Sequence, residues 1–321
     1  MRETEVAIPA DGITLAGTMA TPEGEGPHPT ALLLAGSGPL DRDGNHKKFP
    51  LNTSRDLASL LATEGWASLR FDKRGVGASS GDYLSTGFFD ELDDAHAAYR
   101  WLRSRDDIET VALVGHSVGT LMSLEIADRE PDVDGAILLA ATTKTGEETL
   151  AWQTAKIGEN IVPGPVKALL RLFRTSVAKQ QQKAVAKLKK TTTDTARIQL
   201  AKVNAKWMRE FIAYDPVPTL ERVTIPLLAI TGSKDVQVDP ADLAVILATA
   251  ARAEALEVPD VDHILRHEPA PFSNPRHYGK QLKEPIDPRV IESLVDWLGR
   301  RWPATKPSSE DEASGPGQTP A

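Results

Sequence analysis

The chain contains no cysteine. Disulfides, thiolate metal sites and a cysteine nucleophile are therefore excluded, and the absence is typical of a cytoplasmic protein. The chain also lacks any run of about 20 uninterrupted apolar residues, the length that a membrane-spanning helix needs. Residues 1–5 (MRETE) are polar and have no apolar core of the kind found in a secretory signal. The sequence thus predicts a cytoplasmic protein that has no membrane partner.

Acidic residues outnumber basic ones, 45 to 37, and the net charge of −8 argues against a nucleic-acid partner. The charge is uneven, however, because residues 167–206 hold eleven Lys/Arg and one acid, Asp194, a local balance of +10. This contrast marks the stretch as a distinct structural unit. Its lysines form either an ordinary solvated helix face or a positive field that attracts anionic substrates, and both interpretations stay open. The oligomeric state is not indicated.

Strand and helix patterns alternate through the first 140 of the 321 residues. Strands separated by helices imply crossover connections, and hence a mostly parallel sheet with helices on both faces. The expected strands are residues 4–8, 14–20, 30–34, 67–71, 111–114 and 135–140, and the expected helices are residues 56–63, 88–103 and 117–129.

The alternation then stops, and residues 142–220 show only helix-forming sequence rich in Ala, Lys, Gln and Leu. We interpret this block as a helical cap inserted into an α/β core made of residues 1–141 and 221–303. The core pattern resumes with a strand at 226–231, a helix at 239–251, a strand at 255–258 and a helix at 288–301. Residues 304–321 are rich in Pro, Gly, Ser and acids, and are expected to be a disordered tail.

The strongest chemical signal is the G-x-S-x-G motif at residues 115–119 (GHSVG), directly after an expected strand and before an expected helix. A nucleophilic serine needs such a sharp turn, because its hydroxyl must project above the edge of the sheet. Gly115 and Gly119 remove side chains that would collide there, and the start of the helix provides N–H groups near the reacting oxygen. Ser117 is therefore the candidate nucleophile.

Serine needs a base, and the base needs an acid to orient it. After such a motif the acid comes first along the chain and the histidine second. Asp235 follows the expected strand at 226–231, so it lies on the same sheet edge as Ser117. His263 lies in the loop after the last expected strand. These three residues form the predicted triad.

The rivals for these roles fit less well. Asp239 precedes Pro240 and is predicted to be a helix N-cap. Asp262 adjoins the candidate base in sequence, which directs its side chain elsewhere. His267 is the second candidate for the base, and His116 occupies the variable motif position, where packing is the usual role.

Acyl transfer also requires two N–H donors for the developing negative charge. The first is expected from Val118, the residue after the nucleophile. The second is expected from the Gly-rich turn at residues 35–39 (AGSGP), with Ser37 as the preferred donor and Gly38 as the second choice.

Five segments belong together: residues 36–43 (GSGPLDRD), 71–77 (FDKRGVG), 115–119 (GHSVG), 214–216 (YDP) and 232–235 (GSKD). With them the chain resembles the α/β-hydrolase superfamily, in its serine-hydrolase branch of carboxylesterases related to the dienelactone-hydrolase and serine-aminopeptidase-like groups. The likeness extends from about Gly12 to Leu298 and implies the α/β-hydrolase fold, hydrolysis of short-chain esters, no metal and no organic cofactor. The chain departs from the usual Gly-x-x-His approach to the base, because Val261 and Asp262 precede His263.

The sequence therefore predicts a serine hydrolase that acts on a small-molecule ester. Amide, peptide or thioester cleavage by the same triad remains open, since the leaving-group preference depends on the pocket. A catalytically inactive relative that only binds ligands is the alternative from another class. Residues 41–45 (DRDGN) resemble a calcium loop, but the third acid and the closing Glu are missing. The charges of residues 72–75 (DKRG) are expected to pair with neighbouring side chains.

Overall fold

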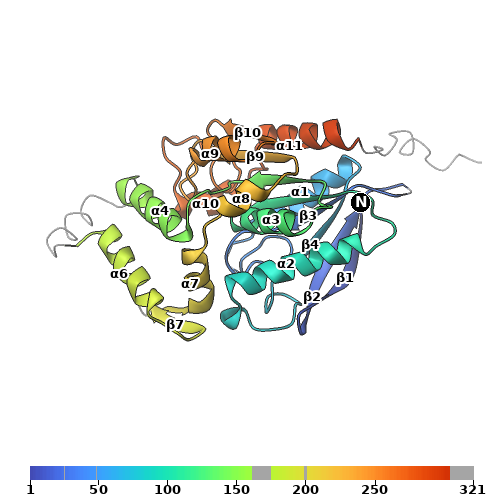
Figure 1. The fold of residues 1–321 in the computed structure, drawn as a ribbon. Helices are drawn as coiled ribbons and strands as arrows, with labels where there is room; N and C mark the ends of the chain where they lie inside the picture. The colour runs from blue at the N-terminus through green and yellow to red at the C-terminus, as the bar shows by residue number, and fades with distance from the viewer. Residues whose placement is uncertain (25, 48, 161–174, 199–200, 304–321) are drawn as a thin grey trace, which may run out of the picture.

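The computed structural model describes residues 1–24, 26–47, 49–160, 175–198 and 201–303. Within them, one eight-stranded sheet forms the centre, and helices cover both of its faces (Figure 1). The predicted α/β-hydrolase fold class is confirmed. The predicted disordered tail, residues 304–321, lies outside the described residues.

The sheet has the strand order β1-β2-β4-β3-β5-β6-β9-β10. β1 and β2 form an antiparallel hairpin, and β2 also pairs antiparallel with β4, whereas all the later neighbours are parallel. The carboxyl ends of β3, β5, β6, β9 and β10 therefore meet at one edge. The strands are β1 (Arg2–Ala10), β2 (Ile13–Thr21), β3 (Thr30–Leu34), β4 (Ala67–Phe71), β5 (Val111–His116), β6 (Gly135–Leu139), β9 (Leu227–Gly232) and β10 (Ala253–Val258).

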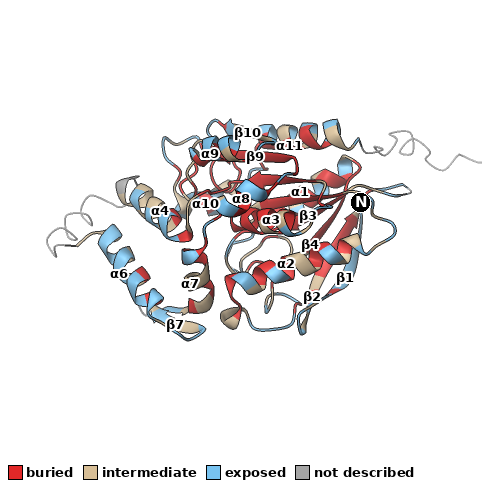
Figure 2. Ribbon diagram, viewed as in Figure 1, coloured by how far each residue is buried: buried red, intermediate tan, exposed pale blue. Residues whose placement is uncertain are grey.

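Burial on both faces explains why the central strands are uninterrupted apolar runs. In β3, Leu32 and Leu34 point into one core, while Ala31 and Leu33 point into the other. The strands are accordingly buried along their length (Figure 2). The first core is closed by α2 (Phe88–Arg103), α3 (Val118–Arg129), α8 (Val217–Arg222) and α9 (Asp242–Thr249), and the second by α1 (Thr53–Thr63) and α11 (Pro288–Arg301).

Most of the chain between β6 and β9 projects from the sheet and corrects one prediction (Figure 1). It contains helices, as expected, but also an antiparallel hairpin, β7 (Thr195–Ile198) and β8 (Ala201–Asn204). The prediction of an exclusively helical block is therefore wrong at the hairpin, and the cap boundaries 142–220 stay a prediction. The helices here are α4 (Gly146–Asn160), α6 (Val177–Lys189) and α7 (Ala205–Ala213); shorter helices elsewhere are η1 (Tyr83–Ser85), η2 (Pro275–His277) and α10 (Tyr278–Gln281).

α6 combines a narrow apolar stripe with a basic outer face. Val185 and Leu188 are buried against neighbouring helices. The lysines on its other side and at its end are exposed to solvent: Lys179, Lys183, Lys187, Lys189 and Lys190. No helix in the described ranges has the length and apolarity to cross a membrane.

Candidate active site

Ser117 lies between β5 and α3, at the sheet edge where the parallel strands end. Its backbone has φ of 54° and ψ of −121°, a conformation that L-residues rarely adopt. The two motif glycines make this turn possible: a Cβ on Gly115 would lie 2.4 Å from the Gly119 carbonyl oxygen, and one on Gly119 would lie 2.0 Å from that of Leu34. The predicted strained turn is therefore present.

The structure brings the three predicted side chains into one hydrogen-bonded chain. His263 Nε2 lies 3.1 Å from Ser117 Oγ, and His263 Nδ1 lies 2.8 Å from Asp235 Oδ2. An ionised carboxylate only accepts hydrogen bonds, so Nδ1 carries the proton and Nε2 is left to accept the serine hydroxyl proton. Asp235 and His263 are each 4% exposed, which protects this arrangement from competing water.

The acid is itself fixed by its own loop. The second carboxylate oxygen of Asp235, Oδ1, accepts the N–H groups of Gln237 at 2.7 Å and Val238 at 2.9 Å. Behind it, a Cβ on Gly232 would lie 2.2 Å from the Val261 carbonyl oxygen, so only glycine lets the acid loop approach the base loop this closely. One carboxylate oxygen of Asp235 therefore accepts hydrogen bonds from the backbone of its own loop, and the other accepts one from His263.

The rival residues lie elsewhere. Asp262 is buried, and its Oδ1 accepts the N–H groups of Ile264 and Arg266 at 3.1 Å. Burial raises the pKa of Asp262 to about 6. His267 is exposed. Asp239 accepts the Ala241 N–H in the turn before α9, so its prediction as the helix N-cap is wrong by two positions, because the N-cap is Ala241 itself.

His116 has a structural contact, in agreement with its predicted packing role. Its Nε2 donates to the His263 carbonyl oxygen at 2.8 Å, and the two rings lie 5.1 Å apart between centroids. Burial is the largest cause that lowers the pKa of His116 to about 4, followed by the charge of His263. His116 is thus neutral near pH 7, and it ties the nucleophile turn to the loop of the base.

A cavity of about 150 Å³ opens directly above these groups. Ser37 and Val118, the predicted donors, line it together with Ser117. Its other walls carry no charged side chain among the described residues, and they come mainly from α4, α7 and the acid loop: Leu121, Thr142, Thr149, Leu150, Gln153, Trp207, Met208, Phe211, Gln237 and Val238.

Residues 51–270 match the family model for serine aminopeptidase, S33. The matched span includes Ser117, Asp235 and His263. The chain belongs to this family of α/β hydrolases.

The relatives of this S33 member include esterases. The chain is 29% identical over 290 residues to esterase EstD of Thermotoga maritima, and the alignment covers 88% of this chain and 65% of EstD. The chain thus spans less than two thirds of the length of that relative. Its fold matches Est1E of Butyrivibrio proteoclasticus with ferulic acid bound (TM-score 0.62, 16% identity, 92% of this chain and 98% of that one). It also matches the Pyrococcus furiosus esterase Pf2001 (TM-score 0.62, 15% identity, 94% and 91%).

Two sets of residues at the site of this S33 member were missed by sequence reasoning. The first is the wall of the cavity formed by Trp207, Met208 and Phe211, which the sequence shows only as an apolar helix face. The second is Lys73, which donates to the loop that carries Ser37, together with its ion-pair partner Glu91. The predicted charge pairing of residues 72–75 is confirmed, but the identity of the partners depends on tertiary packing.

Proposed function

We propose that the protein is a carboxylesterase that cleaves short-chain esters through an acyl group on Ser117. The observation that carries this proposal is the hydrogen-bonded chain Ser117–His263–Asp235 at the floor of a small uncharged cavity. The resemblance to EstD supports the choice of esters.

The groups at the site supply each step of acyl transfer. His263 Nε2 takes the proton of Ser117 Oγ as this oxygen attacks the ester carbonyl. The carbonyl oxygen becomes negative and accepts the Ser37 and Val118 N–H groups. His263 then gives its proton to the departing alkoxide, which leaves as the alcohol. A water molecule repeats the attack with His263 as base, releasing the acid and restoring Ser117.

The lining of the cavity favours esters over aminopeptidase substrates. An aminopeptidase holds a protonated amino terminus, and a buried ammonium group needs an anionic partner. No acidic side chain lines the described part of this cavity. We therefore expect p-nitrophenyl butyrate to be hydrolysed well and leucine p-nitroanilide poorly. A reversal of this order would favour peptidase activity by the same triad.

The cavity volume predicts a preference for short acyl chains. A cavity of about 150 Å³ is large enough for a benzene-sized group. Along a series of p-nitrophenyl esters, kcat/KM is expected to fall about tenfold or more at the first chain length that no longer fits. Met208→Ala should move that break to longer chains. Val185 packs behind the wall in the same apolar cluster as Met208. Val185→Ala is therefore the matched control, and it should leave the chain length at which kcat/KM falls unchanged.

The two candidate bases are separable by mutation. His263→Ala is expected to lower kcat by about 10⁴-fold or more, because members of a triad act as a unit. His267→Ala should leave kcat within about twofold, since the side chain is exposed. Steady-state rates on p-nitrophenyl butyrate give both values. The opposite ranking would transfer the role of base to His267.

A further inference from the structure

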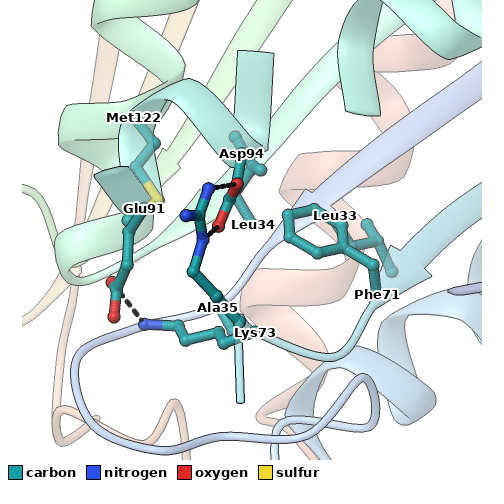
Figure 3. A pocket seen from close by; sticks show the side chains of 9 residues that line it. Leu33, Leu34, Ala35, Phe71, Lys73, Glu91, Asp94 and Met122 are labelled. Atoms are coloured by element: carbon teal, nitrogen blue, oxygen red, sulfur yellow. Dashed lines mark hydrogen bonds and ion pairs between the residues drawn. The ribbon is translucent and has the colours of Figure 1, made fainter. Parts of the chain in front are cut away.

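A buried ion pair lies behind the loop that follows β3. Lys73 Nζ is 3.0 Å from Glu91 Oε2, and their side chains are 7% and 3% exposed. Figure 3 shows the ends of the two side chains pointing toward each other, joined by a dashed line. Buried ion pairs rarely repay their desolvation in stability, so the pair calls for a reason other than stability.

The reason lies in a second contact of Lys73. Lys73 Nζ also donates to the Gly36 carbonyl oxygen at 2.7 Å. The loop carrying this carbonyl adjoins the nucleophile, because a Cβ on Gly36 would lie 3.3 Å from Ser117 Cβ. Lys73 thus connects a buried carboxylate to the backbone beside Ser117.

The geometry of a peptide unit gives this contact its meaning. The Gly36 carbonyl and the Ser37 N–H belong to the same planar trans unit, in which C=O and N–H point in opposite directions. Holding the carbonyl oxygen on the Lys73 side therefore turns the Ser37 N–H away from Lys73. Ser37 lines the cavity that contains Ser117. A cation on the carbonyl also polarises the unit, which makes its N–H a stronger donor.

We propose that Lys73 is a positioning residue for the oxyanion site, and that Glu91 holds its ammonium group in place. Lys73 fixes the Gly36–Ser37 peptide so that the Ser37 N–H is aimed at the negative oxygen of the tetrahedral intermediate. The inference rests on the proposed esterase function and adds residues that no step of the mechanism touches directly.

The same region offers a matched control. Arg74 Nε and Nη2 bind the two Asp94 carboxylate oxygens at 3.0 and 2.6 Å. Both ion pairs line one small cavity of about 20 Å³ (Figure 3). Among the described residues, the Arg74 side chain hydrogen-bonds to Asp94 and not to Gly36 or Ser37, so replacing this pair disturbs the same region without releasing the loop.

The test compares Lys73→Met/Glu91→Leu with Arg74→Met/Asp94→Leu, since paired replacements leave no buried charge alone. The first variant is expected to lose about 10²- to 10³-fold in kcat with KM little changed, the loss typical of one oxyanion donor. Its affinity for a trifluoromethyl ketone, which mimics the tetrahedral intermediate, should fall by a similar factor. The second variant should keep kcat within about threefold. Glu91→Gln, a milder change, should fall between wild type and the first variant.

Equal losses of kcat in the two paired variants, or unchanged kcat in both Lys73→Met/Glu91→Leu and Glu91→Gln, would overturn the inference. An effect on KM alone would do the same. If the paired variant does not fold, the kcat of Glu91→Gln decides the test. Failure of the proposed function is distinguishable, because the wild-type protein would then show neither ester hydrolysis nor reaction of Ser117 with a fluorophosphonate.

Discussion

Ser117→Ala is expected to lower kcat for ester hydrolysis by about 10⁶-fold, to the background level, while the protein stays folded. The change removes one hydroxyl whose described hydrogen bond is to His263 Nε2. Ser117 makes no side-chain capping bond to α3, so alanine removes no cap. Alanine also meets the same φ of 54° that serine tolerates. Rates on p-nitrophenyl butyrate and thermal unfolding curves measure both expectations.

Labelling with a fluorophosphonate separates the enzyme from an inactive ligand-binding relative. The probe should modify wild-type protein and leave Ser117→Ala unlabelled. A wild-type protein that does not react would favour the inactive alternative. Hydrolysis retained by Ser117→Ala would place the nucleophile at another residue.

Asp235→Asn should lower kcat by about 10⁴-fold, because it favours the wrong tautomer of His263. The structure makes this expectation specific. The N–H groups of Gln237 and Val238 hold Oδ1, so the amide oxygen of Asn occupies that position and the NH₂ group faces His263. An NH₂ group donates to Nδ1, which moves the ring proton to Nε2. His263 then has no free acceptor for the Ser117 proton.

Two acids provide the controls for this prediction. Asp239→Asn and Asp262→Asn should reduce kcat much less, since neither carboxylate hydrogen-bonds to His263 in the described structure. The unfolding curves of all three variants should be compared, because burial makes Asp262 sensitive to substitution. If Asp235→Asn were nearly as active as wild type and Asp262→Asn were not, the acid would be misassigned.

The core of the fold was predictable because its signals are local. β4, α2 and α11 begin and end at the predicted residues, since each has a clear apolar period and a marked boundary. The proximity of Ser117, Asp235 and His263 was also predictable. Parallel strands deliver their ends to one edge, so residues 118 and 28 positions apart in sequence meet there.

The features that were missed depend on tertiary contacts or on weak turn signals. The hairpin of β7 and β8 has four-residue strands, and no Gly, Asn or Asp lies between Ile198 and Ala201 to mark a turn. Its apolar side chains Ala196, Ile198 and Val203 pack against a small cluster formed by α6 and α7 of the same segment. Lys73 likewise gives no sequence sign that it reaches the carbonyl of Gly36, 37 positions earlier.

Most of the cavity wall comes from α4 and α7, which lie in the stretch of chain between β6 and β9, and Leu121, Gln237 and Val238 complete it. Ser117, Asp235, His263 and Ser37 lie on loops that follow strands of the central sheet. Most of the cavity wall and the Ser117–His263–Asp235 chain are therefore encoded by different stretches of the gene. A recombination event or an engineered chimaera can replace the first as a unit and leave the second untouched. On the proposed function, such an exchange is expected to change which esters are hydrolysed while Ser117, Asp235 and His263 stay in place.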